Sequence, residues 1–231
     1  MSEALTRSTL LLGESSMRRL QEATVTVVGL GGVGGYVAEA LARSGVGHLH
    51  LVDFDTVQPS NLNRQIFATK HTVGLLKTAA AKQRIEAVSD CAVTLFDGRV
   101  TEETVSLAVP KCDFLVDCID SMDGKIALAV YAQTHGIPML ACMGAGNRLD
   151  PSAFAVVDLS RTEQCPLARR YRQALRRLGI LHLPCVMSRE RALPPQAEGI
   201  GSLAPVVGAA GLVAAGYVLQ YFYESGKENE R

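Results

Sequence analysis

Val-Thr-Val-Val at residues 25–28 runs directly into Gly-Leu-Gly-Gly-Val-Gly at residues 29–34. An apolar, β-branched run that ends in glycines is typical of a strand that turns tightly into a helix and exposes backbone N–H groups to a phosphate. Asp53 follows at the end of a second apolar run, where dinucleotide-binding folds place the acid that holds a ribose. The stretch therefore predicts a nucleotide site without choosing the nucleotide.

A polar cluster beyond the second predicted strand favours ATP over a hydride-carrying dinucleotide. Its members are Asp53, Asp55, Asn61, Arg64 and Lys77. Opposite charges gathered around one point suit phosphate groups and a metal ion, whereas hydride transfer needs a dry nicotinamide pocket. We interpret the cluster as an ATP site that adenylates a carboxylate.

Length and composition predict one domain over residues 1–231. The chain has 231 residues, 48% of them apolar, which is enough for one doubly wound core. We expect a nucleotide-binding half over residues 1–150 and a substrate-side extension with a C-terminal helix over residues 151–231. Six cysteines without a Cys-x-x-Cys pair, and no secretory signal, predict free thiols in the cytoplasm.

Two segments stand out by their charge. Residues 161–191 hold eight arginines against two acids, although the formal net charge of the chain is zero. Residues 199–223 carry no charge at all and are long enough to cross a bilayer. Their Gly and Ala content suits close packing on a sheet, and no polybasic anchor flanks them, so we predict a buried helix without stable membrane insertion.

Alternating apolar and amphipathic segments predict an α/β fold: a Rossmann-like, doubly wound, mostly parallel sheet with helices on both faces. The expected strands cover residues 24–29, 48–53, 92–96, 114–118 and 139–142, and the expected helices cover 13–20, 33–43, 74–88, 101–107 and 125–134. A short C-terminal α/β extension follows, with a strand over 154–158, a helix over 166–177, the segment 183–188 and the uncharged helix. Residues 191–201 have turn chemistry and are predicted to form a mobile crossover loop.

The ordered motifs resemble those of the ubiquitin-activating, ThiF-type adenylyltransferase superfamily. They are Gly-x-Gly-Gly-x-Gly at 29–34, Asp-x-Asp at 53–55, Ser-Asn-Leu-Asn-Arg-Gln at 60–65, Val-Gly-x-x-Lys at 73–77 and Asp-Cys-Ile-Asp at 117–120. Members adenylate the C-terminus of ubiquitin-like sulfur carriers, or act on a modified tRNA nucleoside.

The second half of the chain is similar to the branch that dehydrates threonylcarbamoyladenosine in tRNA. The similarity lies in Asp-Leu-Ser-Arg-Thr at 158–162, Pro-Leu-Ala at 166–168, Cys-Val-x-Ser at 185–188 and Lys-Ile-Ala-Leu at 125–128. Sulfur-carrier enzymes commonly carry two Cys-x-x-Cys zinc pairs, which this chain lacks. Activation of a sulfur carrier, and a non-catalytic ATP-binding scaffold in sulfur relay, remain the alternatives.

The resemblance implies a set of residues that bind ATP. They are Gly29, Gly31, Gly32, Gly34, Asp53, Asp55, Asn61, Arg64, Gln65, Lys77, Asp120 and Ser121. Asp53 would hold the ribose, Asn61, Arg64 and Lys77 would contact the phosphates, and Asp120 would bind Mg²⁺ near the leaving pyrophosphate. Arg64, Lys77 and Asp120 are also the expected catalytic residues.

Two further catalytic candidates come from outside this set. Arg7 lies where family members present an arginine to the nucleotide of a partner subunit, which implies a homodimer with composite sites. Cys185 stands in a segment that matches the dehydratases and could act as a thiol, although a buried free cysteine is the commoner case.

The resemblance implies that the enzyme activates the threonylcarbamoyl carboxylate on the adenosine beside a tRNA anticodon and closes a cyclic ester with loss of water. A basic surface is what a tRNA partner requires. The arginines expected to form it lie on the helix over 166–177, at Arg169, Arg170, Arg172, Arg176 and Arg177. A cysteine desulfurase or another sulfur-relay protein is a further possible partner.

Overall fold

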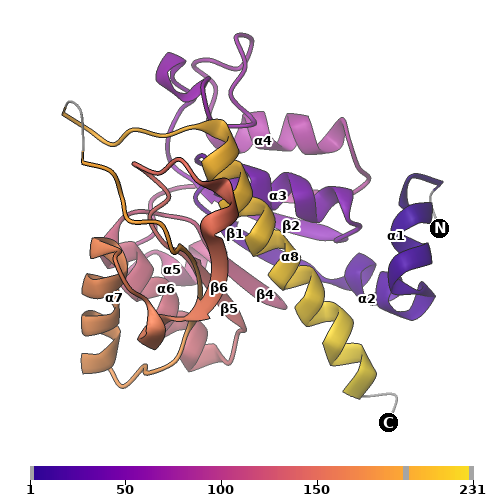
Figure 1. The fold of residues 1–231 in the computed structure, drawn as a ribbon. Helices are drawn as coiled ribbons and strands as arrows, with labels where there is room; N and C mark the ends of the chain where they lie inside the picture. Colours follow the sequence, from indigo (N-terminus) through magenta and orange to yellow (C-terminus); the bar gives the residue numbers. More distant parts are fainter. Residues whose placement is uncertain (1–2, 195–197, 229–231) are drawn as a thin grey trace.

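A computed structural model describes residues 3–194 and 198–228 of the chain. Within these residues, seven strands form one sheet in the order β3-β2-β1-β4-β5-β7-β6 (Figure 1). The strands are β1 Thr24–Val28, β2 His48–Asp53, β3 Ala92–Asp97, β4 Phe114–Asp117, β5 Met139–Cys142, β6 Phe154–Asp158 and β7 Pro184–Ser188. Strand β6 is antiparallel to β7, and the other neighbouring strands are parallel.

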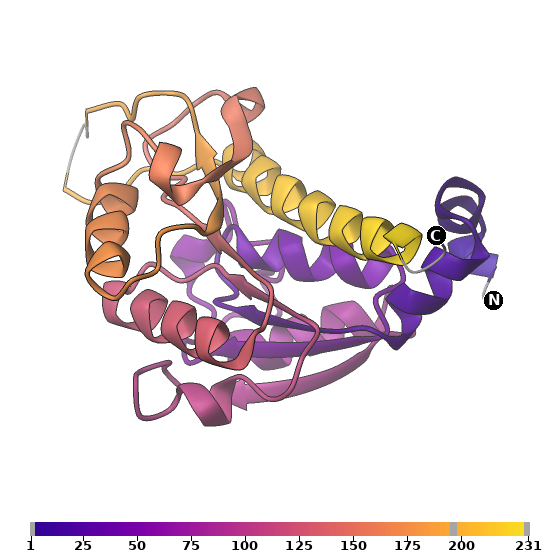
Figure 2. The ribbon, with the colours of Figure 1, turned by 90° about the horizontal axis from the view of Figure 1, so that it is seen from below.

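Helices cover both faces of this sheet. They are α1 Thr6–Leu12, α2 Glu14–Glu22, α3 Gly34–Arg43, α4 Lys77–Glu86, α5 Val105–Ala108, α6 Met122–His135, α7 Pro166–Arg177 and α8 Ala204–Glu228. Helices α2, α3, α4 and α8 share one hydrophobic core with the sheet, and α5, α6 and α7 share a second core on the other face. Figure 2 shows the yellow helix α8 lying alongside α3.

Local signals fix the ends of the helices on the second face. The Ser121 side chain accepts the backbone N–H of Gly124 and starts α6, which ends at Gly136 in the left-handed region with a φ of +63°. Helix α7 begins at Pro166, and the sulfur of Cys165 accepts the N–H of Ala168. These caps set the lengths of the two helices that flank β4 and β5.

Helix α8 contains the uncharged segment. Among the described residues, its part Ala204–Ser225 is the one helical stretch long and apolar enough to cross a membrane, with a mean hydropathy of 1.4, and half of that stretch is buried inside the protein. Val206, Ala210, Ala214 and Val218 recur every four residues and are buried. The segment therefore packs on the core, as predicted.

The predicted fold class is confirmed, with differences at several boundaries. The helix expected over residues 74–88 begins at Lys77, because Gly74 has a φ of +90° and Leu76 forms an isolated bridge with Thr56. Helix α1 was not expected. The predicted crossover loop has no helix or strand where it is described, and its residues 195–197 lie outside the described part of the chain.

The strand order places a crevice at the carboxyl ends of the two central strands β1 and β4. The chain builds β1, β2 and β3 outward in one direction and then returns to add β4 on the other side of β1. Ligands of doubly wound folds bind outside the carboxyl ends of the strands at such a switch point. The glycine turn after β1 and the segment after β4 meet at this point.

Candidate active site

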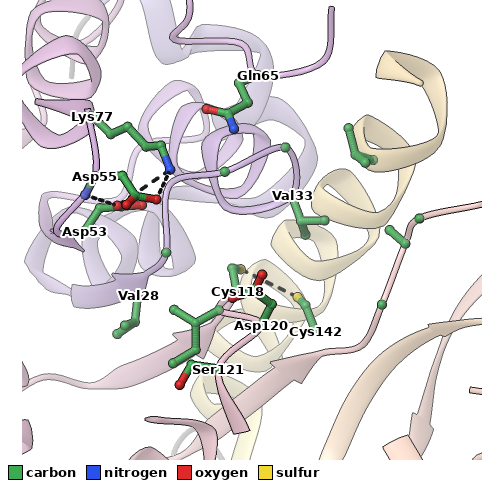
Figure 3. A pocket seen from close by; sticks show the side chains of 18 of the residues that line it. Val28, Val33, Asp53, Asp55, Gln65, Lys77, Cys118, Asp120, Ser121 and Cys142 are labelled. Carbon is green, nitrogen blue, oxygen red and sulfur yellow. Dashed lines mark hydrogen bonds and ion pairs between the residues drawn. The ribbon is translucent and has the colours of Figure 1, made fainter. Parts of the chain in front are cut away.

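A cavity of about 500 Å³ opens at the carboxyl ends of β1, β2, β4 and β5. Its volume lies within the range of small-molecule sites. Figure 3 shows side chains from these separate segments turned toward one space, with α8 on the side away from Asp53 and Lys77. All of the nucleotide-site residues predicted above line this cavity, except Gly34.

The glycine turn is held in place by close backbone packing. Gly29 has a φ of +90°, and its N–H donates to the carbonyl of Val52 at 2.8 Å. A side chain at Gly34 would collide with the carbonyl oxygen of Gly29, so only glycine fits where α3 begins. The N-terminus of α3 therefore lies beside the cavity, in a position that suits an anion.

Asp53 organises this turn as well as lining the cavity. One oxygen of its buried carboxylate accepts the Leu30 N–H at 2.6 Å, and the other accepts the Asp55 N–H at 2.9 Å. The Lys77 ammonium, at the start of α4, lies 2.8 Å from Asp55 Oδ2 and 3.8 Å from Asp53 Oδ1. Two carboxylates thus hold one lysine beside the glycine turn (Figure 3).

Asn61, Arg64 and Gln65 come from the segment after β2. Asn61 ends the short 3-10 helix Pro59–Asn61, where its Oδ1 accepts the Gln58 N–H at 3.0 Å. The guanidinium of Arg64 donates to the Ser60 carbonyl at 2.8 Å, and the residue lines the cavity. This segment supplies uncharged donors and one cation to the same space.

Asp120 and Ser121 follow β4 and lie across the cavity from Lys77 (Figure 3). The Asp120 residue is exposed, in contrast to the buried Asp53. Among the described residues, no group of three or more His, Cys, Asp or Glu side chains is arranged to hold a metal ion. A single exposed carboxylate fits Mg²⁺, which commonly takes one or two carboxylates and completes its shell with phosphate oxygens and water.

The cavity also contains a pair that the sequence reasoning missed. The guanidinium carbon of Arg99 lies 4.2 Å from the centre of the Phe54 ring, and both residues line the cavity next to Asp53. A cation over an aromatic face is attractive. Phe54 follows β2 and Arg99 follows β3. Because these predicted strands are neighbours, the positions of the two residues could have indicated that they meet at the cavity.

The sequence profile of the ThiF family matches residues 5–231. The chain belongs to the ThiF family. It is 38% identical over 199 residues to the tRNA threonylcarbamoyladenosine dehydratase of Escherichia coli, covering 82% of this chain and 74% of that protein. It is 30% identical over 197 residues to the molybdopterin-synthase adenylyltransferase of Salmonella typhimurium, covering 85% and 71% of the two chains.

Solved structures agree with this membership of the ThiF family. The Escherichia coli tRNA N6-threonylcarbamoyladenosine dehydratase in complex with AMP matches with a TM-score of 0.94 and 35% identity, covering 98% of this chain and 96% of that one. The same enzyme in complex with ATP matches with a TM-score of 0.92 and 34% identity, with the same coverage.

A buried ion pair, also missed by the sequence reasoning, holds two residues that line the cavity, Ile119 and Cys142. The Lys125 ammonium lies 2.8 Å from Asp117 Oδ2, and neither side chain is exposed. Lys125 also donates to the carbonyl of Cys142 at 2.9 Å, and Asp117 Oδ1 accepts the Ile119 N–H at 3.1 Å. Burial raises the pKa of the Asp117 carboxyl, although Lys125 opposes this effect.

The surroundings of Cys185 do not favour the thiol chemistry expected for it, because the side chain is buried. Cys185 lies on β7 and is completely buried, and it does not line the cavity. Burial raises the pKa of its thiol to about 12, so the reactive thiolate is scarce at neutral pH. The structure therefore places Cys185 in the core, away from the residues that line the cavity, and its catalytic role stays a prediction.

The predicted arginines occupy different environments. Arg7 lies on α1, is exposed and does not line the cavity of its own chain. On α7, Arg169, Arg170, Arg176 and Arg177 are exposed. Arg172 instead donates to the carbonyl of Thr162 at 2.6 Å and ties α7 to the preceding segment. It is therefore engaged within the fold rather than presented on the basic surface.

Removing Lys125 alone should destabilise the fold strongly. Lys125→Met leaves the Asp117 carboxylate buried without its cation, and we expect a loss of about 3–5 kcal/mol in the free energy of unfolding. Adding Asp117→Asn in the double variant should restore part of that loss. Urea denaturation of the wild type, both single variants and the double variant measures this, and strictly additive losses would contradict the coupling.

Cys185→Ala should leave ATP turnover within about threefold of the wild type, because the thiol is buried and does not line the cavity. In the folded wild type at pH 7.5, iodoacetamide should alkylate Cys185 more slowly than a thiol of ordinary pKa, and the rate should increase with pH because the thiolate fraction does. Peptide mass spectrometry follows the alkylation. Loss of turnover in a stably folded Cys185→Ala protein would support the catalytic assignment.

Proposed function

We propose that the protein is an ATP-dependent dehydratase that adenylates the carboxylate of N6-threonylcarbamoyladenosine in tRNA and cyclises it. The observation that carries the proposal is the joint placement of the glycine turn, Lys77, Arg64 and Asp120 around one cavity, in a chain that superposes over nearly its whole length on a dehydratase solved with ATP.

The proposed chemistry takes place in two steps. A carboxylate oxygen attacks the α-phosphorus of ATP, an acyl-adenylate forms and pyrophosphate leaves. An oxygen within the same threonylcarbamoyl group then attacks the activated carboxyl carbon, the cyclic ester closes and AMP leaves. The nucleoside loses one water overall, and that oxygen remains on AMP. The protein supplies position and charge stabilisation for both steps.

Each polar residue predicted for the nucleotide site has a role in these steps. Asp53 accepts hydroxyls of the ribose while it holds the turn, and Lys77, Arg64 and Asn61 stabilise negative charge on the phosphates. Gln65 and Ser121 line the nucleotide, and Asp55 keeps the Lys77 ammonium beside the glycine turn. Asp120 holds Mg²⁺, which when bound neutralises charge on the phosphate groups.

The exposed arginines of α7 form the proposed tRNA surface. Arg169, Arg170, Arg176 and Arg177 lie on one helix whose residue Leu167 lines the cavity. An RNA backbone bound along α7 can therefore bring a nucleoside to the cavity. Phosphate contacts of this kind supply affinity that falls as the salt concentration rises.

Several further expectations belong to the same proposal. The enzyme works as a homodimer in which Arg7 reaches the nucleotide of the partner subunit. It acts in the cytoplasm, where tRNA is modified, and a cysteine desulfurase or another sulfur-relay protein is a candidate partner. Residues 1–150 bind the nucleotide, and residues 151–231 contribute the substrate side within one adenylation domain.

Incubation with ATP, Mg²⁺ and tRNA that carries threonylcarbamoyladenosine should release AMP and pyrophosphate. Mass spectrometry of the digested nucleosides should show a loss of about 18 mass units on the modified adenosine, because one water leaves. Asp120→Asn should lower turnover about a hundredfold or more. Asp90→Asn, at an exposed carboxylate outside the cavity, is the matched control and should not change it.

Reversing two exposed arginines should weaken tRNA binding. Arg170→Glu with Arg177→Glu should raise the Kd for tRNA at least about tenfold and reduce the slope of log Kd against log salt by about two. Arg18→Glu with Lys82→Glu makes the same change in net charge at exposed side chains of α2 and α4, and serves as the control. Equal effects of the two double variants would exclude α7 as the specific surface.

The role of Arg7 in trans is tested by complementation. Arg7→Ala and Asp120→Asn should each be nearly inactive alone, whereas mixed subunits should recover about a quarter of the wild-type turnover, because a heterodimer then contains one complete site. Turnover of Arg7→Ala at the wild-type rate, or a mixture that stays inactive although subunits exchange, would exclude a composite site.

A further inference from the structure

A short segment before α8 contributes to the lining of the cavity. Residues 199–202, which we call the strap, precede α8, and Ile200 and Ser202 line the cavity. The facing wall is the segment after β5, residues 144–146, which lines the same cavity. The strap and this wall come from parts of the chain more than fifty residues apart, so a specific contact must hold them together.

Asn147 makes that contact. Its backbone N–H donates to the Gly201 carbonyl at 2.8 Å, and its side-chain Oδ1 accepts the Gly201 N–H at 2.7 Å. Its own carbonyl accepts the Leu193 N–H at 2.7 Å. Asn147 has a φ of +54°, a left-handed conformation that asparagine tolerates better than most residues. Asn147 thus joins the wall to Leu193 and to Gly201, which both precede α8 in the chain.

The strap contacts the wall at Gly146 and contacts Asn63 from the segment after β2. A side chain at Gly146 would overlap the Ile200 side chain, so Ile200 lies directly on the wall. Asn63 Nδ2 donates to the Ser202 carbonyl of the strap at 2.9 Å. Asn63 immediately precedes Arg64 in the sequence. The strap is therefore fastened to the phosphate side of the cavity as well as to the wall.

Arg148 shapes the wall from behind. It is 5% exposed, and its Nη1 donates to the carbonyls of Gly144 at 2.8 Å and Gly146 at 3.0 Å. These two bonds hold the carbonyls of Gly144 and Gly146 on the same guanidinium nitrogen and so stabilise the conformation of the wall. A side chain at Gly144 would lie 3.9 Å from the sulfur of Cys165, the cap of α7, so the wall also reaches the arginine helix.

We propose that Asn147 is a positioning residue that docks the strap on the wall and thereby shapes the part of the cavity that receives the acyl substrate. On the nucleotide side, the hydrogen bonds that hold Asp53 and Lys77 come from other segments and do not involve the strap. The nature of the acyl substrate rests on the proposed function, whereas the docking itself rests on the hydrogen bonds of Asn147. The proposal predicts a loss in substrate use without a loss in ATP binding.

Two substitutions at Asn147 separate its hydrogen bond from its backbone conformation. Asn147→Gly keeps the left-handed conformation and the backbone bond but removes the Oδ1 acceptor. Asn147→Asp keeps an acceptor oxygen in the same place and is the matched control. Hydrogen exchange of the Gly201 N–H reports docking, calorimetry gives the Kd for ATP, and steady-state kinetics gives kcat/KM for the modified tRNA.

In Asn147→Gly, we expect exchange at Gly201 to accelerate about five- to tenfold, the size of one net hydrogen bond. The value of kcat/KM for tRNA should fall by a similar factor, and the Kd for ATP should stay within about twofold. Asn147→Asp should keep slow exchange and restore most of kcat/KM.

Three results would overturn the proposal. The first is unchanged exchange at Gly201 in Asn147→Gly. The second is faster exchange with unchanged use of tRNA, and the third is a parallel loss of ATP binding, which would indicate general distortion. If the wild type does not turn over modified tRNA, the proposed function fails, and a retained slow exchange at Gly201 in Asn147→Gly would separately overturn the docking.

Discussion

The buried pair of Lys125 and Asp117 is the interaction on which the site depends. Removing two charges from water costs several kcal/mol for each ion, so the pair persists only because its remaining hydrogen bonds are satisfied. Lys125 bonds to the carbonyl of Cys142 at the end of β5, and its own carbonyl accepts the hydroxyl of Tyr171 on α7 at 3.0 Å. Asp117 accepts the N–H of Ile119. Lys125 and Asp117 thus connect β4, β5, α6 and α7.

This connection explains how one cavity combines two kinds of chemistry. The glycine turn, Asp53 and Lys77 belong to the first strands of the sheet and suit a nucleotide. The wall after β5, the strap and the start of α7 belong to the later part of the chain and face the same space. The ion pair fixes the end of β4 between these two groups, and our proposal places Asp120 where a phosphate and an acyl substrate would meet.

The sequence predicted the parts that depend on local patterns. The limits of β2, β5, β6 and α7 follow from apolar runs and turn residues, and the ordered motifs placed the nucleotide-site residues around one crevice. Long-range contacts were not predictable from one chain. Nothing near Lys125 indicates its partner, Arg172 looks like its exposed neighbours although it bonds to Thr162, and the contact between Asn147 and Gly201 spans 54 residues. The burial that raises the pKa of the Cys185 thiol was likewise not predictable, because it results from the packing of the folded sheet.

The central claim is that the carboxylate attacks the α-phosphorus of ATP. It is tested most directly with tRNA whose threonylcarbamoyl carboxylate carries ¹⁸O, followed by mass spectrometry of the products after turnover. Attack at the α-phosphorus predicts AMP that carries one ¹⁸O and pyrophosphate that carries none. If ¹⁸O appears instead in inorganic phosphate, with ADP as the nucleotide product, the carboxylate is activated at the γ-phosphorus and the adenylation account is wrong.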